Sequence, residues 1–181
     1  LRRLGVDAHL IARVGDDPLG RMVTDHLRAE GLTTRGVVVD HDRPTACYLR
    51  EWLPDGERRL TYYRTDSAGS RLCADDVAFP EPTPGLLHLT GITPALGPSA
   101  AAAVDVAIGL ATSLGVPISF DPNFRPRLWS AEAARPLLRR IAARSDVLLM
   151  SAGRPTAFDA RYFGPLPRAQ IQTVVSPLLT W

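Results

Sequence analysis

The chain has 181 residues, of which 45% are hydrophobic and 22% are charged, a composition typical of one soluble globular domain. Its formal net charge of +2 gives no electrostatic reason to expect a nucleic-acid partner, and no apolar run approaches the roughly 20 residues of a membrane span. Two cysteines and four histidines without ligand spacing predict neither a disulfide framework nor a metal site, and the lack of a signal-peptide profile makes the cytoplasm the expected location.

All 21 basic residues are arginines. A chain without lysine has neither the amine of a Schiff-base enzyme nor the lysine of a Walker-type phosphate loop. A lysine-dependent aldolase is therefore excluded. Arginine is therefore the basic residue available to bind anions, and its planar guanidinium binds them through two parallel hydrogen bonds.

The first third of the chain is predicted to form a strand followed by a helix. Residues 8–14 (AHLIARV) form an apolar run, and residues 16–31 have a helical pattern that begins at Asp16 or Asp17, with Pro18 in the first turn. The two aspartates also suggest a metal-binding pair. Helix capping explains them without a metal ion, and we favour that interpretation.

Residues 36–64 are predicted to form three strands, at 36–40, 45–53 and 57–64. The last two are joined by Pro-Asp-Gly, which suits a three-residue hairpin loop with Gly56 in the left-handed conformation. This loop places Tyr48 opposite Tyr62, and because side chains alternate between faces, Tyr62 and Arg64 share one face. These residues form either one side of a binding site or a solvated hairpin with an ordinary cross-strand aromatic pair. The residues alone leave both open.

From residue 86 onward short apolar strands alternate with helices. Strands are predicted at 86–90, 116–120 and 146–150, and helices at 98–114 and 130–144. This alternation is typical of βαβ units with a parallel sheet, so the expected fold class is α/β. Ligands of such sheets bind outside the carboxyl ends of the strands. Asp121, Asn123 and Arg125 follow the strand at 116–120, and we expect them at a binding site. From about residue 151 the pattern fails.

Five segments of the chain, in this order, are similar to segments of one protein family. They are GVDAHLIARVGDDPLG, YLREWLPDGERRLTYYR, SAGS, LHLTGITPAL and DPNFRPRLW. Together they resemble the PfkB, or ribokinase-like, carbohydrate kinases, and most closely the 2-keto-3-deoxygluconate kinases. The resemblance covers residues 1–153 and implies a partial ribokinase-like domain, a parallel βαβ sheet with a small β lid at roughly 36–64.

The resemblance also implies a substrate site and a reaction. Tyr48, Tyr62 and Arg64 match lid positions that contact the substrate, and Arg125 matches the arginine that reaches the substrate and the transferred phosphate. Asp121 and Asn123 are expected to support them. The implied reaction is phosphorylation of a sugar acid such as 2-keto-3-deoxygluconate, with ATP and Mg²⁺. Arg64 suits the carboxylate of that acid. The lid is also expected to form the contact of a homo-oligomer.

Parts of the family pattern are missing from the sequence. The Gly-Ala-Gly-Asp segment, which in the family supplies the catalytic base and the phosphate cradle, does not occur, so we expect no base and no nucleotide site in this chain. The first strand and the Gly-Gly segment that grips the sugar are missing too. We therefore expect an inactive fragment that lacks the N-terminal strand and the C-terminal half. Residues 154–181 are expected to be a disordered or frame-shifted tail.

Two alternatives remain beside the sugar-acid kinase. A kinase for a neutral sugar such as fructose or ribose shares the fold, but Arg64 beside two tyrosines suits a carboxylate, which a neutral sugar lacks. A non-catalytic remnant that binds a sugar acid is favoured by the missing base. Such a module would still need the missing N-terminal strand.

Overall fold

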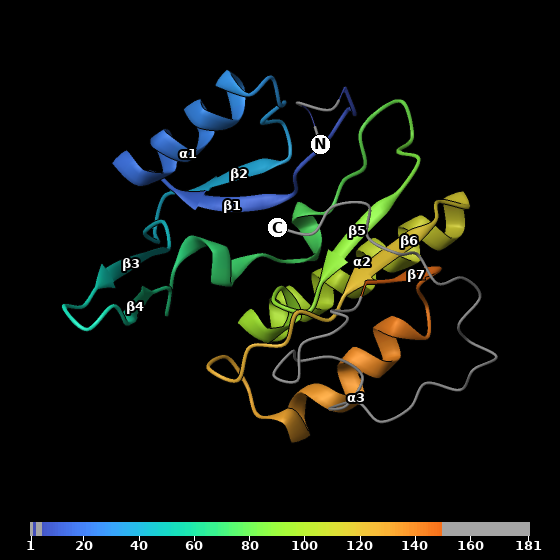
Figure 1. Cartoon of the computed structure of the whole chain (residues 1–181). Coiled ribbons are helices and arrows are strands. Elements are labelled where there is room, and N and C mark those ends of the chain that lie inside the picture. Colours follow the sequence, from blue (N-terminus) through green and yellow to red (C-terminus); the bar gives the residue numbers. More distant parts are fainter. Residues whose placement is uncertain (1, 3–4, 150–181) are drawn as a thin grey trace. The chain divides into compact units, whose positions relative to one another are not determined.

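The computed structural model describes residue 2 and residues 5–149. These residues divide into two compact units, both drawn in Figure 1. The first contains the residues up to Pro82 and residues 96–107, and the second contains residues 83–95 and those from 108 onward. The tail predicted at 154–181 and the last residue of the strand predicted at 146–150 lie outside the described residues.

The first unit contains a parallel pair of strands joined through a helix. The elements are β1 (Ala12–Gly15), α1 (Pro18–Ala29) and β2 (Val37–Asp40), and Figure 1 shows α1 beside the two strands. The strand predicted at 8–14 is wrong at its start. Its partner β2 begins only at Val37, opposite Ala12, and upstream His9 makes a single bridge to Thr33.

The start of α1 confirms the capping interpretation for one of the two candidate aspartates. Asp17 is the N-cap, and its side chain accepts the N–H of Gly20 at 2.7 Å. Asp16 lies outside the cap and contacts His41 at 3.0 Å and Arg21 at 3.6 Å instead.

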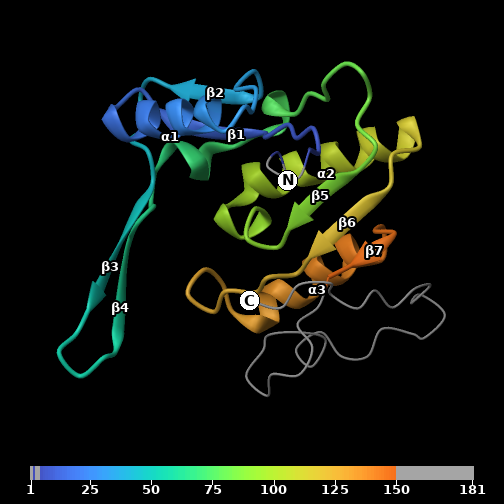
Figure 2. The same cartoon turned by 45° about the horizontal axis from the view of Figure 1, so that its top comes forward.

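A two-stranded antiparallel hairpin extends from the first unit, and Figure 2 shows it as a long ribbon. It consists of β3 (Cys47–Trp52) and β4 (Arg58–Tyr63). The N–H of Leu53 donates to the carbonyl of Glu57 at 2.9 Å, which closes the predicted Pro-Asp-Gly loop. Gly56 has the predicted left-handed conformation, with φ of 83°.

After the hairpin the first unit continues with two short 3₁₀ helices, Ala68–Arg71 and Ala74–Asp76. Leu72 lies between them and packs with Ala100 and Ala103, from the first turns of α2 (Pro98–Leu114). The predicted bounds of that helix are confirmed. Ile11, Val77 and Leu96 border this apolar cluster.

The second unit contains a parallel sheet in the order β5–β6–β7. Its elements are β5 (Leu87–Thr90), β6 (Ile118–Asp121), α3 (Ala131–Ala142) and β7 (Val147–Leu148). Ser130 caps α3 by accepting the N–H of Ala133 at 3.2 Å. Phe120 of β6 and Leu138 and Ile141 of α3 are almost fully buried. The parallel pairing confirms the predicted α/β class. No helix within the described ranges is long and apolar enough to cross a membrane.

Candidate substrate-binding site

Three predicted substrate residues meet on one face of the hairpin. Tyr48 lies directly opposite Tyr62 in the β3–β4 ladder, with ring centroids 5.8 Å apart and planes tilted by 38°, within the range in which aromatic rings attract each other. The guanidinium of Arg64 lies 4.4 Å from the centroid of the Tyr62 ring, which is a cation–π contact. The predicted opposition of the two tyrosines is therefore confirmed.

The same face continues toward the hairpin loop. Because directly paired residues of an antiparallel ladder share a face, Arg50 with Leu60 and Trp52 with Arg58 extend it. The Arg58 guanidinium lies 4.5 Å from the Trp52 ring centroid, and that of Arg50 lies 6.0 Å from the Tyr48 ring centroid. We call this surface, from Arg64 to Trp52, the aromatic face.

The two faces of the hairpin differ in how their arginines are paired. On the aromatic face Arg50, Arg58 and Arg64 contact rings and have no carboxylate partner among the described residues. On the opposite face Arg59 contacts Glu51 at 3.5 Å. Accessible guanidiniums beside aromatic rings favour a ligand that combines an anionic group with some apolar surface.

The second group of predicted residues lies at the carboxyl end of β6. Asp121 ends the strand and accepts the N–H of Asn123 at 2.9 Å, and Asn123 has φ of 35°, a left-handed conformation that asparagine tolerates. The Arg125 side chain that follows is exposed. These residues belong to the second unit and the hairpin to the first, so the structure divides the predicted site residues into two sets.

A glycine that was not predicted as a site residue fixes the turn after β6. The N–H of Gly91 donates to the carbonyl of Asp121 at 2.8 Å. A Cβ at Gly91 would lie 2.0 Å from the carbonyl oxygen of Pro122 and 2.8 Å from the side chain of Leu138, so no other residue fits without displacing the turn. The feature of the sequence that could have indicated this close approach is a glycine directly after a predicted apolar strand.

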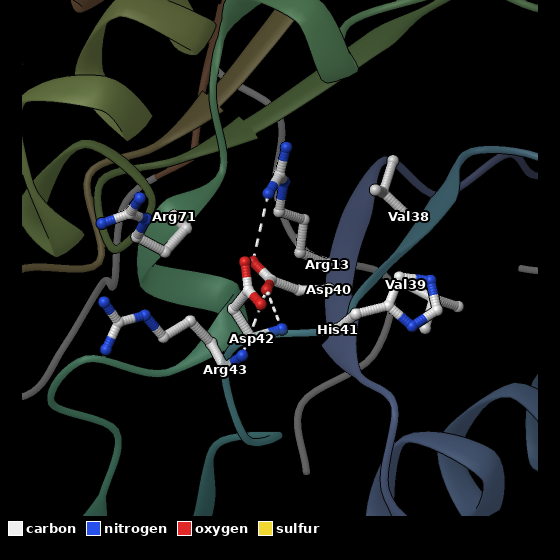
Figure 3. A pocket seen from close by; sticks show the side chains of 8 residues that line it. All are labelled: Arg13, Val38, Val39, Asp40, His41, Asp42, Arg43 and Arg71. Atoms are coloured by element: carbon white, nitrogen blue, oxygen red, sulfur yellow. Dashed lines mark hydrogen bonds and ion pairs between the residues drawn. The ribbon is translucent and has the colours of Figure 1, made fainter.

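The first unit also contains a pocket of about 340 Å³ that none of the predicted site residues lines. Its lining residues are Arg13, Val38, Val39, Asp40, His41, Asp42, Arg43 and Arg71, shown in Figure 3. The Arg13 guanidinium donates to Asp40 at 3.2 Å and also, at 2.6 Å, to Asp76, which does not line the pocket. The other oxygen of Asp40 accepts the backbone N–H groups of Asp42 and Arg43.

In the network formed by Arg13, Asp40 and Asp76, each charged side chain has a partner of opposite charge. The Asp76 side chain is only 4% exposed and that of Asp40 only 10%. The hydrogen bond to Asp76 raises the pKa of Arg13, and the N–H of Asp42, together with Arg13, lowers the pKa of Asp40. Burial alone would raise the pKa of Asp76, but hydrogen bonds from Arg13 and Cys73 lower it below its usual value. We interpret the network as structural. The feature of the sequence that could have indicated this network is an arginine, Arg13, inside the apolar run LIARVG.

The described residues contain no metal-binding cluster. Within residues 5–149 no group of three or more His, Cys, Asp or Glu side chains is arranged to hold one. Cys47 and Cys73 are both free thiols.

Comparison with known proteins identifies the family. The sequence model of the pfkB family of carbohydrate kinases matches residues 1–152. The chain belongs to this family. Over 150 residues this pfkB chain is 42% identical to 2-dehydro-3-deoxygluconokinase of Thermoproteus tenax, a match that covers 80% of the chain and 45% of that protein. It is also 34% identical over 151 residues to Fructokinase-1 of Zea mays, covering 82% of the chain and 46% of that protein.

A solved structure supports the same fold for the pfkB chain. The crystal structure of 2-dehydro-3-deoxygluconokinase from Thermotoga maritima matches it with a TM-score of 0.75 and 28% identity, covering 81% of this chain and 46% of that one. The ribokinase-like fold is therefore confirmed. The chain spans about half the length of the curated relatives it matches. The substrate roles of Tyr48, Tyr62, Arg64 and Arg125 remain predictions.

Proposed function

We propose that the whole protein transfers a phosphoryl group from ATP to a hydroxyl group of a sugar acid such as 2-keto-3-deoxygluconate, and that the hairpin of this chain binds the acid. The observation that carries the proposal is the position of Arg64 over the ring of Tyr62, which itself contacts the ring of Tyr48, on a face whose arginines have no described carboxylate partner. A sugar acid supplies that carboxylate. The relatives whose name is 2-dehydro-3-deoxygluconokinase support the same choice.

Each residue of the aromatic face has a separate task in this proposal. The Arg64 guanidinium donates two parallel hydrogen bonds to the substrate carboxylate, a geometry specific to planar anions. The rings of Tyr48 and Tyr62, which are 53% and 40% exposed, cover the carbon chain of the sugar acid. A covered substrate excludes water, which favours transfer to the sugar hydroxyl over hydrolysis of ATP.

Arg125 has a different task because it follows the carboxyl end of β6. Its exposed guanidinium binds the charge that develops on the phosphoryl group during transfer. Asp121 and Asn123 support it by fixing the turn from which Arg125 projects.

The proposal includes ATP and Mg²⁺ because the chain belongs to a family of carbohydrate kinases. Bound to the whole protein, they supply the phosphoryl group and neutralise part of its charge. Residues 5–149 contain no group of three or more His, Cys, Asp or Glu side chains arranged to hold a metal ion, and the sequence contains no Gly-Ala-Gly-Asp segment. We assign no catalytic base, metal ligand or nucleotide contact to them.

Calorimetric titration of residues 1–181 tests the substrate class. We expect heat of binding with 2-keto-3-deoxygluconate and none with fructose or ribose, and no sugar-dependent release of ADP from ATP. Equal binding of fructose would favour the neutral-sugar kinase, which the identity to Fructokinase-1 makes the second candidate. Release of ADP that Arg125→Ala abolishes would show that the chain is catalytically complete.

The opposite face of the hairpin is proposed as the contact of a homo-oligomer. Leu49 and Tyr63 on that face are 59% and 57% exposed. Two large apolar side chains on an extended ribbon favour contact with a second copy over solvation.

A further inference from the structure

One carboxylate connects the start of α1 to the base of the hairpin. Oδ1 of Asp17 accepts the N–H of Gly20 at 2.7 Å, and Oδ2 accepts the N–H of Thr45 at 2.6 Å. The hydroxyl of Thr45 in turn accepts the N–H of Gly15, the last residue of β1, at 2.8 Å. Two segments that are separated in sequence, residues 15–20 and the segment at Thr45, therefore meet through Asp17, and the second leads directly into β3.

This junction leaves no room for a side chain at either of its two glycines. A Cβ at Gly20 would lie 2.0 Å from the carbonyl oxygen of Gly15 and 2.9 Å from the hydroxyl oxygen of Thr45. A Cβ at Gly15 would lie 2.7 Å from the backbone nitrogen of Thr45. The two glycines let the end of β1 and the first turn of α1 approach the base of the hairpin within hydrogen-bonding distance.

The segment that leaves the hairpin is tied to the segment that enters it. The carbonyl of Pro44 accepts the N–H of Ala68 at 2.9 Å, and Arg43 is hydrogen-bonded to the carboxylate of Asp66. Ala68 is fully buried. A fixed Thr45 therefore fixes both strands of the hairpin at their base.

We infer that Asp17 is a positioning residue for the substrate-binding hairpin, because the second oxygen of its carboxylate holds Thr45 and so sets where Tyr48 and Arg64 lie. The inference rests on the proposed function of the aromatic face. Tyr48 is three residues from Thr45, so a change at the base displaces the ring. Displacements of about 1 Å around a bound substrate are costly.

Helix capping alone does not require this carboxylate. An N-cap needs one acceptor oxygen, and asparagine or serine supplies it as well as aspartate does. The Thr45 N–H, followed by the Gly20 N–H, lowers the pKa of Asp17, which supports a carboxylate shared between both contacts. Asparagine would keep one oxygen for Gly20 but turn an NH₂ group toward the N–H of Thr45. Asp17→Asn therefore separates the two roles.

The test compares Asp17→Asn with the neighbouring Asp16→Asn in the full chain, by hydrogen exchange and by calorimetry with 2-keto-3-deoxygluconate. In Asp17→Asn we expect amides at residues 45–48 to exchange about tenfold faster, because the Thr45 N–H loses its acceptor. Amides of α1 should keep their exchange rates. The affinity for the sugar acid should fall about tenfold, a change comparable with the loss of one such hydrogen bond. Asp16→Asn should change neither readout.

Two further variants keep the inference open to refutation. Thr45→Val, which loses the hydroxyl acceptor of the Gly15 N–H, should loosen the same amides, and Thr45→Ser should restore them. Equal effects of Asp17→Asn on α1 and on the hairpin, or no effect on the hairpin, would overturn the inference and leave Asp17 as a helix cap. If the unchanged chain binds no sugar acid, the proposed function fails, and the exchange rates alone decide whether Asp17 anchors the hairpin.

Discussion

Tyr48 and Tyr62 occupy directly opposed positions in the hairpin, and the loop of Pro54, Asp55 and Gly56 determines that opposition. Each added or removed loop residue would shift the register and turn one tyrosine to the other face. The loop, which touches neither ring, therefore determines whether two phenols and the Arg64 guanidinium share a surface.

Arg64→Ala should weaken binding of the sugar acid much more than binding of any neutral sugar. A charged hydrogen-bonding partner contributes about 2–3 kcal/mol, so the dissociation constant for 2-keto-3-deoxygluconate should rise by about 30- to 150-fold. Calorimetry measures it. Arg59→Ala is the matched control, because Arg59 lies on the opposite face and pairs with Glu51. An equal loss for acid and neutral sugars would contradict the sugar-acid assignment.

Acid should destabilise the first unit through Asp40 and Asp76. Both carboxyls have a pKa below the usual value when folded. Such a group contributes stability that is fully present above the unfolded pKa of about 4 and is lost as the pH falls through the lower folded pKa. Urea unfolding between pH 7 and pH 3 should therefore show stability that declines below about pH 4.

Asp76→Asn provides the variant for this prediction. It leaves Arg13 partly buried without its main partner, so the free energy of unfolding at pH 7 should fall by about 2–3 kcal/mol. The acid-dependent decline should also become shallower. Asp25→Asn serves as control, since the pair of Asp25 with Arg28 is exposed and contributes under about 1 kcal/mol. A decline as steep as in the unchanged chain would assign the acid sensitivity to other groups.

Gly91→Ala should destabilise the second unit. The added methyl group meets the carbonyl of Pro122, and overpacking of this kind costs about 1–3 kcal/mol. Thermal unfolding measures the loss. Gly109→Ala in α2 is the control: no atom lies within 4 Å of the new Cβ, and alanine in a helix should stabilise the chain by about 0.5–1 kcal/mol. Equal melting temperatures of the two variants would refute the close contact.

Leu49→Glu should dissociate the proposed oligomer. A carboxylate on the opposite face of the hairpin would have to be buried between two copies, which is unfavourable. Light scattering after size exclusion measures the mass. Met22→Glu on α1 changes a side chain that is 62% exposed, close to the 59% of Leu49, and should leave the mass unchanged. An unchanged chain that is monomeric at all concentrations would contradict the proposal.

Features that depend on neighbouring residues could be predicted from the sequence. Pro98 and Gly115 bound α2 where they were expected to, and Pro-Asp-Gly gave the hairpin register. Of the candidate site, this was enough to place Tyr48, Tyr62 and Arg64 on one face.

Features that depend on contacts between distant segments could not be predicted. Asp17 was recognised as a cap from its local pattern, but its contact with Thr45 joins residues 28 positions apart. Arg13 and Asp76 are 63 positions apart. The tight approach of Gly91 to Pro122 follows from strand pairing that no single segment encodes. Periodicity reports which face of an element is apolar and carries no information on these partners.

The position of Trp52 gives the hairpin its own optical reporter. Its side chain is 63% exposed and lies under Arg58 at the end of the aromatic face, whereas the indole N–H of Trp129 is buried. A dissolved quencher such as iodide therefore reaches Trp52 far more readily than Trp129. Anything that covers the aromatic face should shield this fluorescence, so that occupancy of the hairpin can be followed without a label in a chain that carries Trp181→Phe.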